Sequence, residues 1–450
     1  MSARINVVAG RDMQSNGCPG LDIVNILMMT NTYAPHIGGV ARSIQRFARR
    51  YRWLGHQVRI VAPEFDGPAP DEEDVVRLPA VRHFNHTDFS LELPVPHQLE
   101  PLIKSFEPDI VHAHHPFLVG GTALRVAHTH DLPLVFTHHT RYEDYTHNVP
   151  GDSAVMKRFA QRLATNYANL CDRVFVPSES IRTLVIERGV TAPVSVVPTG
   201  VEIDDFAQGD GAGMRRALGV PEDAFVVGHL GRLTEEKNIP FLTDAIVRFV
   251  SEADPATNAH CVLFGTGPLE RDIRRRFGAH GIADRLHVGG VIEEACLADA
   301  YHAMDVFAFA STSETQGMVI TEAMASGVPV VALDAPGVRE IVEDRRNGHL
   351  LGSPDIFTFA AALADIARFV SYDPTEYDRL SRAAVSSAAR LSMERTAETA
   401  LEYYSRLRRY DAAHRRVDRA PWSDAFDIAA SEWELFLNTL QSAAEAIPRK

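Results

Sequence analysis

Cysteine is scarce in this chain, and the cysteines that occur lie far apart. No two of them form a C-x-x-C pair; the four are Cys18, Cys171, Cys261 and Cys296. This spacing favours a reduced, cytosolic protein over a disulfide framework or a cysteine-based zinc site. Apolar runs of bilayer length are also absent, and the N-terminus lacks the long apolar core of a signal peptide. Any contact with a membrane is therefore expected to be peripheral.

Positive charge is in deficit as well. The formal net charge is −14, and this argues against a generic nucleic-acid binder because the phosphate backbone would be repelled on average. The chain is nevertheless large. Its 450 residues with 45% hydrophobic content can bury sizeable cores and indicate two domains.

The most informative stretch of the sequence lies between residues 305 and 333. It begins with an apolar strand at 306–310 and a polar loop at 311–317. A helix at 318–326 and a second strand at 328–333 follow. This order predicts a strand–loop–helix–strand unit of parallel α/β type.

Two carboxylates eight residues apart mark this unit, Glu314 in the loop and Glu322 in the helix. Gly317 lets the backbone approach a ligand closely, and the N–H groups of Gly317, Met318 and Val319 favour an anion such as a diphosphate. Glu322 can then accept hydrogen bonds from a ribose diol, and Glu314 can meet the group beyond the phosphates. The spacing alone is equally compatible with a solvated helix residue and an ordinary loop carboxylate.

The segment E-T-Q-G-M-V-I-T-E-A, which begins at Glu314, resembles the E-x7-E signature of family-4 retaining glycosyltransferases. These enzymes have two facing Rossmann-like domains, the GT-B architecture. The resemblance covers about residues 23–385. It implies that Glu322 binds the nucleotide ribose, while Glu314 and the following backbone amides contact the sugar and the phosphates.

A glycine pair, Gly38 and Gly39, lies between the first predicted strand at 23–29 and the first predicted helix. A phosphate-approaching Rossmann turn needs glycine there, but the full G-x-G-x-x-G is missing, so the pair alone is a weak signal. Family-4 enzymes carry a similar turn near the donor diphosphate. The resemblance therefore implies a donor-binding role for both glycines.

A second phosphate element is predicted after the strand at 225–230. Arg232 and Lys237 lie five residues apart across a tight turn before a helix, so together they can neutralise a diphosphate leaving group. The alternative is surface charge paired with Glu235 and Glu236. The resemblance places both cations at the donor phosphates.

Five histidines gather at the ends of two predicted strands: His112, His114, His115, His138 and His139. Clustered imidazoles can bind a metal, but the carboxylate that usually accompanies such a site is missing nearby. A polar cleft edge without chemistry is the alternative. The resemblance singles out His139, at the position where family-4 enzymes have a histidine beside the transferred sugar. Residues 112–117 and 137–145, the latter including Tyr142 on the acceptor side, particularly resemble bacterial diacylglycerol glucosyltransferases.

The helix that follows the glycine pair is rich in arginine and has no acidic residue between Gly38 and Ala62. The arginines that lie off its apolar stripe are Arg42, Arg46, Arg49, Arg50 and Arg52. Such a face is usually just solvated. In an acidic chain it can also dock on anionic lipid headgroups, each charge contributing about 1 kcal/mol near that surface. The sequence leaves both possibilities open.

The predicted organisation is α/β, with two facing Rossmann-like domains and a C-terminal helical extension. We expect an N-terminal extension (1–22), an acceptor-side domain (23–205), a nucleotide-sugar-binding domain (206–390) and C-terminal helices (391–450), the first of which crosses back. The final segment has one apolar helical face, made of Trp422, Phe426, Ala429, Trp433, Leu437 and Leu440.

The predicted function is retaining transfer of a hexose from a nucleotide-diphosphate sugar, UDP-glucose by preference, to a membrane lipid such as diacylglycerol. The alternatives are a soluble or polysaccharide acceptor, for instance with GDP-mannose as donor, a non-catalytic nucleotide-sugar binder, and a hydrolase built on the histidines. There is no well-placed Asp-x-Asp motif, so no cofactor and no divalent metal are expected. The expected location is the cytoplasm or the inner face of the cell membrane.

Overall fold

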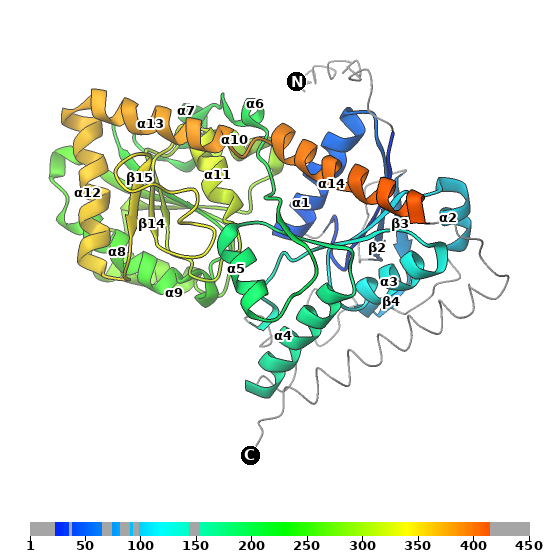
Figure 1. Ribbon diagram of the computed structural model, residues 1–450. Helices are drawn as coiled ribbons and strands as arrows, with labels where there is room; N and C mark the ends of the chain where they lie inside the picture. Colours follow the sequence, from blue (N-terminus) through cyan, green and yellow to red (C-terminus); the bar gives the residue numbers. More distant parts are fainter. Residues whose placement is uncertain are drawn as a thin grey trace, which may run out of the picture.

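The computed structural model describes residues 23–35, 38–64, 74–81, 91–92, 99–143 and 154–414. The predicted N-terminal extension, the apolar face of the C-terminal segment and residues 144–145 of the histidine-containing stretch lie outside these residues. The described chain forms two α/β lobes side by side (Figure 1).

The N-terminal domain is built on a seven-stranded parallel sheet with the order β3-β2-β1-β6-β7-β8-β9. Its strands are β1 (Asn25–Met29), β2 (Gln57–Pro63), β3 (Val75–Leu78), β6 (Ile110–Ala113), β7 (Leu134–Thr137), β8 (Arg173–Val176) and β9 (Val194–Val196). Its helices are α1 (Gly39–Trp53), α2 (Glu100–Phe106), α3 (Val119–His130), α4 (Ala154–Asn169) and α5 (Glu179–Glu187). Two short strands, β4 (Ala80–Val81) and β5 (Leu91–Glu92), pair separately.

The C-terminal domain repeats the plan with a six-stranded parallel sheet in the order β12-β11-β10-β13-β14-β15. Its strands are β10 (Phe225–Leu230), β11 (Ala259–Phe264), β12 (Leu286–Gly290), β13 (Val306–Phe309), β14 (Val330–Leu333) and β15 (Gly348–Leu351). Its helices are α6 (Ile203–Phe206), α7 (Gly211–Leu218), α8 (Ile239–Glu252), α9 (Glu270–Ala279), α10 (Leu297–His302), α11 (Met318–Ala325), α12 (Ile356–Tyr372) and α13 (Pro374–Ala389). Short 3₁₀ turns include η4 (Glu235–Lys237) and η7 (Glu294–Cys296).

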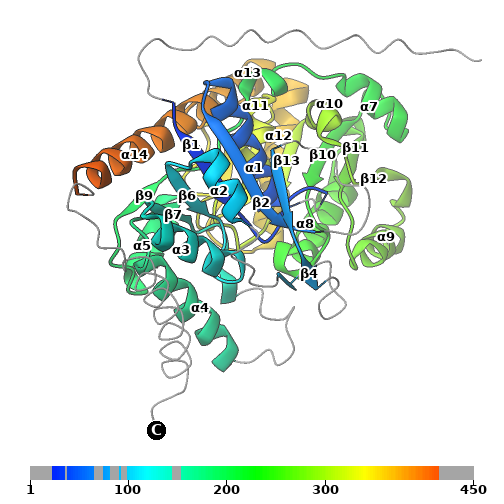
Figure 2. The ribbon, with the colours of Figure 1, turned by 90° about the vertical axis from the view of Figure 1, so that its right-hand side faces the viewer.

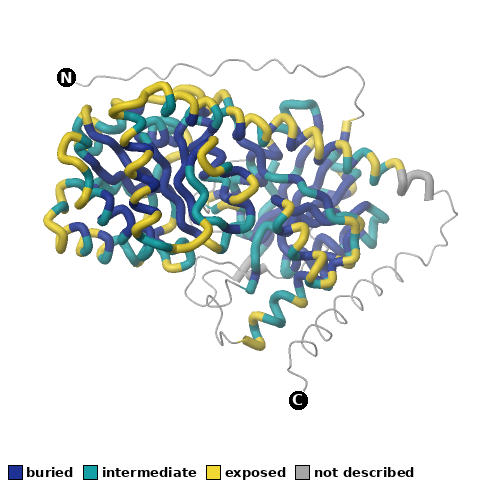
Figure 3. The backbone as a smooth tube through the Cα atoms, turned by 60° about the vertical axis from the view of Figure 1, so that its left-hand side comes forward, coloured by how far each residue is buried: buried dark blue, intermediate teal, exposed yellow. Residues whose placement is uncertain are grey.

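Each sheet is covered by helices on both faces, so its strands are apolar almost throughout. Every residue of β10, β11, β13 and β14 is buried. Two hydrophobic cores therefore flank each sheet, and the exposed backbone lies mainly on the outer helices and loops (Figure 3). The predicted fold class is confirmed.

The long helix α14 (Met393–His414) leaves the C-terminal domain and lies against the N-terminal one (Figures 1 and 2). Ala397, Leu401 and Tyr404 of this helix are buried in the core that also contains Ile26 and Tyr51. Ser392, immediately before this helix, also forms a β-bridge with Val201 of the linker. The two domains are thus held together by two chain crossings.

The central unit of the sequence folds with small changes from its predicted limits. The second strand begins at Val330 rather than at residue 328. Val328 N–H instead donates to Ala323 O at the end of α11, and Pro329 has no N–H to give to a sheet. Among the described residues, no helix is both long and apolar enough to cross a membrane.

Candidate active site

The candidate site lies where the carboxyl ends of both parallel sheets face each other. Helix α11 follows β13, and Gly317 caps its N-terminus in the left-handed conformation (φ 78°), which glycine adopts at little cost. From the opposite domain, α1 begins at Gly39, where an added Cβ would lie 3.5 Å from Met318 Cε. Two helix N-termini, each favouring an anion, are therefore close neighbours across the domain boundary.

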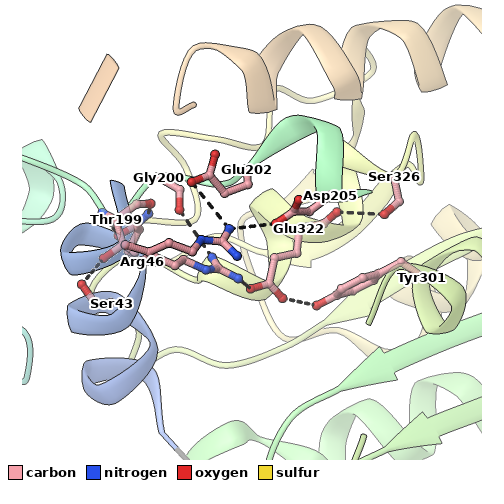
Figure 4. Close-up of polar contacts among 11 residues, drawn as sticks. Ser43, Arg46, Thr199, Gly200, Glu202, Asp205, Tyr301, Glu322 and Ser326 are labelled. Carbon is pink, nitrogen blue, oxygen red and sulfur yellow. Dashed lines mark hydrogen bonds and ion pairs between the residues drawn. The ribbon is translucent and has the colours of Figure 1, made fainter. Parts of the chain in front are cut away.

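Glu322 is completely buried, so it is not a solvated helix residue. Its Oε1 accepts a hydrogen bond from Arg46 Nη2 at 2.5 Å, and its Oε2 accepts one from Tyr301 OH at 2.7 Å (Figure 4). Tyr301 belongs to α10 of the same domain, whereas Arg46 comes from α1 of the other. The sequence identified Glu322 as a site residue but gave no sign of either partner.

Lys237 and Glu314 meet in an ion pair in which both side chains are largely buried. Arg232 pairs instead with Glu236, its Nη2 lying 3.0 Å from Glu236 Oε1, and its side chain remains about half exposed, at 56%. Pairing with a glutamate of the same turn, which was the alternative left by the sequence, therefore occurs for Arg232. Lys237 pairs with Glu314 instead. Both cations and the loop carboxylate Glu314 follow the carboxyl ends of β10 and β13, the two central strands of the sheet.

His139 touches the loop that carries Glu314. Its carbonyl oxygen accepts a hydrogen bond from Thr315 Oγ1 at 2.8 Å, and its ring Nε2 lies 2.9 Å from Nδ1 of His114. Burial, together with the neighbouring His115 and His112, lowers the pKa of His139 well below its ordinary value. The ring is therefore neutral at pH 7 and can exchange hydrogen bonds with uncharged hydroxyls.

Two of the remaining histidines, His112 and His115, are held by protein partners, whereas His138 Nδ1 and His114 Nε2 are buried without a hydrogen-bond partner among the described residues. His112 is held between Tyr404 OH, 2.7 Å from its Nδ1, and Thr137 Oγ1, 2.6 Å from its Nε2. His115 Nδ1 accepts from the backbone N–H of Asn31 at 3.1 Å. Within the described ranges, no three His, Cys, Asp or Glu side chains are grouped so as to hold a metal ion. The cluster is a packed polar network, which does not favour the metal hydrolase.

Burial keeps this network uncharged. It lowers the pKa of His112 to about 3 and the pKa of His138 to about 4, burial being the largest cause in both. His229, buried in β10 behind the donor side, also has its pKa lowered to about 4 by burial. Its Nδ1 lies 3.0 Å from Ala308 O. Nothing in the sequence pattern pointed to His229.

The arginines of α1 do not form a free basic surface. Arg46 is buried against Glu322, and Arg50 pairs with Glu202 of the interdomain linker. Arg49 Nη2 lies 2.8 Å from Asp205 Oδ2 of α6. The membrane-docking prediction is therefore wrong for Arg46. The sequence showed only that Arg46 lies off the apolar stripe of α1, and in the folded chain the C-terminal domain covers this side of the helix.

The other predicted acceptor residues are also enclosed to different degrees. Arg42 is partly buried. It lies close enough to Tyr301 for its charge to oppose the effect of burial, which raises the pKa of Tyr301 well above its ordinary value. Tyr142 is buried against the rings of Phe117 and His138, with centroids 5.3 and 5.6 Å away. Its hydroxyl has no hydrogen-bond partner among the described residues. An acceptor contact by Tyr142 stays a prediction.

A polar cleft of about 400 Å³ opens between α1 and the C-terminal domain. Its walls are formed by Tyr33, Gln45, Arg46, Arg49, Arg52, Asp74 and Glu294. Arg46 is thus both a wall of this cleft and the partner of Glu322.

Two facing parallel α/β domains, with paired helix N-termini, a buried carboxylate and two cations at their junction, define a GT-B glycosyltransferase. The family models agree with this class. Residues 37–205 match Glycosyltransferase Family 4, and residues 224–368 match Glycosyl transferases group 1. The chain belongs to this family of glycosyltransferases and is an enzyme of that kind.

The curated relatives are glycosyltransferases, and the solved structures share the fold. It is 29% identical over 340 residues to the alpha-monoglucosyldiacylglycerol synthase of Streptococcus pneumoniae, covering 73% of this chain and 75% of that one. It is 32% identical over 304 residues to the D-inositol 3-phosphate glycosyltransferase of Kribbella flavida, with 66% and 70% covered. Anabaena HepE, solved with UDP and glucose, shares the fold with a TM-score of 0.64 and 24% identity, over 85% of this chain and 99% of that one.

Proposed function

We propose that this glycosyltransferase is a retaining enzyme that moves a hexose from UDP-glucose to a lipid acceptor such as diacylglycerol. The main observation in support of the donor assignment is the ion pair between Lys237 and Glu314, which lies opposite His139 and beside the N-terminus of α11. The likeness to two glucosyldiacylglycerol synthases, at 29% and 28% identity, supports the lipid acceptor.

In this proposal the protein's main task is to stabilise the charge that develops on the departing diphosphate. The amides of Gly317, Met318 and Val319 and the cations Arg232 and Lys237 supply that stabilisation. Lys237 exchanges its present partner, Glu314, for the phosphates. Glu314 is then available to the hydroxyls of the sugar.

The remaining groups orient the substrates. Glu322 holds the ribose diol, and the neutral ring of His139 positions the sugar through hydrogen bonds. The departing phosphate, on the same face as the acceptor, takes the proton of the acceptor hydroxyl. No protein side chain has to act as a strong base, and with two protein cations at the phosphates we propose turnover without a divalent metal.

Helix α4 is the surface that we propose for contact with an anionic membrane. It contains no acidic residue, and no residue before Ala164 is fully buried. Val155 is 42% exposed, and Lys157 and Arg162 are exposed as well. The end that begins at Ala154 projects beyond the layers of the N-terminal domain (Figures 1 and 2). Exposed cations and apolar side chains on one helix end suit a lipid headgroup region.

A soluble acceptor with a different donor is the second candidate. The relative that favours it is the GDP-mannose-dependent alpha-mannosyltransferase of Mycobacterium tuberculosis, 27% identical over 378 residues, with 80% of this chain and 92% of that one covered. On this alternative, α4 is plain surface.

The test is glucose transfer from UDP-glucose into diacylglycerol held in anionic liposomes, with EDTA present. A glycolipid product supports donor, acceptor and metal independence together. UDP release with only soluble acceptors would discard the lipid, and turnover that requires added divalent metal would discard the metal-free mechanism.

The membrane surface is tested separately by sedimentation with the same liposomes. The double variant Lys157→Glu/Arg162→Glu is expected to bind them more weakly, by about 1 kcal/mol per cation lost. The matched control is Arg271→Glu/Arg275→Glu, two exposed cations of α9, which should leave binding unchanged. Equal loss in both variants would show that only net charge matters and would remove α4 from the proposal.

A further inference from the structure

The carboxylate that the proposed function gives to the nucleotide ribose is already occupied in this structure. Both oxygens of Glu322 accept a hydrogen bond, one from Arg46 and one from Tyr301 (Figure 4). Only 1% of the Glu322 side chain and 6% of the Arg46 side chain is exposed. A ribose diol cannot reach this carboxylate until Arg46 leaves it.

The contact joins the two domains rather than two parts of one. Arg46 lies 276 residues before Glu322 in the chain, on a helix whose apolar stripe is fixed in the N-terminal core. Its Nη1 also donates to the carbonyl oxygen of Gly200 in the linker, at 3.4 Å. One guanidinium therefore connects α1, the linker and α11.

Other contacts at this boundary show that the domains are closed on each other. Gln316, next to the cap of α11, exchanges two hydrogen bonds with the backbone of Thr199, at 2.8 and 2.6 Å. Thr199 Oγ1 lies 2.7 Å from Ser43 Oγ, one turn before Arg46 on α1 (Figure 4). Among these boundary contacts, the ion pair between Arg46 and Glu322 differs in one respect. It occupies the carboxylate that the proposed function assigns to the ribose of the donor.

We propose that Arg46 sets the donor affinity of the enzyme by acting as an interdomain latch, defined here as the Arg46–Glu322 ion pair. This inference rests on the proposed function of Glu322. In the empty enzyme the latch holds the domains closed. When a nucleotide binds, the hydroxyls of its ribose replace the guanidinium as donors to Glu322.

The structure offers the released guanidinium a place to go. Arg46 already forms part of the wall of the 400 Å³ cleft, and Glu294 lines the same cleft from the C-terminal domain. Turning into this open, polar space lets the charge regain water, which avoids the penalty of an unpaired buried ion. When the latch opens, Arg46 therefore exchanges Glu322 for water and does not remain as an unpaired buried charge.

The consequence is a lowered apparent affinity for the donor. A ligand that binds only the unlatched state has its affinity reduced by the fraction of enzyme in that state. If about one molecule in ten is unlatched, removing the latch tightens nucleotide binding by about tenfold. A residue that merely helped to hold the nucleotide would have the opposite effect.

The experiment measures UDP and GDP binding to the nucleotide-free full chain by calorimetry, with Arg46→Gln as the test variant. We expect it to bind its nucleotide about tenfold more tightly than the wild type. Unchanged or weaker binding would overturn the proposal. Arg46→Lys keeps a cation facing Glu322 and should stay near the wild type, and it guards against a Gln variant that fails to fold.

Tyr301→Phe is the matched control, because it removes the other partner of Glu322 without touching the domain boundary. It should not tighten nucleotide binding. Small-angle X-ray scattering of the nucleotide-free proteins gives a second readout, in which Arg46→Gln should have a larger radius of gyration and Tyr301→Phe should not. An identical radius for Arg46→Gln and the wild type would refute the latch.

Scattering also separates the two possible failures. If no variant binds either nucleotide, the proposed donor site is wrong. An expanded Arg46→Gln variant would then still show that the ion pair holds the domains together.

Discussion

Removing the carboxylate of Glu322 is the most direct test of the donor site. The variant is Glu322→Ala, with Glu322→Gln as the milder change that keeps one acceptor oxygen. The structure makes this a well-defined perturbation of the site, because the side chain is buried and, within the described residues, hydrogen-bonds to Arg46 and Tyr301. The expected result is weaker nucleotide binding.

The magnitude follows from the bonds that are lost. A hydrogen bond to a charged group contributes about 1.5–3 kcal/mol, and a ribose diol offers Glu322 two of them. The variant also loses the ion pair with Arg46. Because Arg46 then no longer competes with the ribose for this position, part of the loss in nucleotide binding is offset. A net loss of about 1.5–3 kcal/mol corresponds to a dissociation constant raised about 10- to 150-fold.

The assay is calorimetry with UDP and with 2′-deoxy-UDP. If Glu322 binds the diol, the wild type prefers UDP, and Glu322→Ala binds both nucleotides equally. Glu340→Ala is the matched control. Glu340 is another interdomain carboxylate, whose oxygens accept from the amides of Glu179 and Ser180 at 2.7 Å, so its loss weakens a domain contact without affecting the diol.

Two results would refute the reasoning. Unchanged affinity for UDP in Glu322→Ala would mean that the ribose lies elsewhere. Retained discrimination between UDP and 2′-deoxy-UDP in the variant would show that another residue recognises the diol, even if overall binding had weakened.

Two further predictions concern charge. Lys237→Ala should lower kcat with UDP-glucose about 10²- to 10³-fold, since one preorganised hydrogen-bond donor to the leaving group is lost. The control Arg271→Ala should leave kcat unchanged. Equal kcat values for Lys237→Ala and the wild type would remove Lys237 from the site. The buried histidines should make the fold acid-sensitive, because their pKa values in the folded chain lie below the unfolded value of about 6.5. As the pH falls, the unfolded chain therefore takes up protons first. Their contribution to the free energy of unfolding is complete above about pH 6.5 and falls from there toward pH 4. Each contributes a loss of about 1.4 kcal/mol at pH 5.5 relative to pH 7.5, and identical melting temperatures at these two pH values would contradict this.

Local sequence determined the elements and most of their limits. Strand β10 lies where its apolar run places it, at Phe225–Leu230. Glu314 and Glu322 were recognisable through their resemblance to a family signature, whose strand, loop, glycine and helix occur in a fixed order over a few residues. Periodicity and turn chemistry act within such short windows, so the sequence carries them openly.

Tertiary structure decided which of these side chains meet. The sequence showed that Arg46 lies off the apolar stripe of its helix, but not that a carboxylate 276 residues away covers it. It suggested glutamates of the same turn as partners for Lys237, whereas the folded chain gives it Glu314. It left a metal site open as one alternative for the histidines but gave no sign that the crossing of α14 brings Tyr404 to His112. Ion pairs and buried hydrogen bonds depend on distance in space. Here that distance is set by domain closure for Arg46, by the fold of the C-terminal domain for Lys237 and by the crossing of α14 for His112.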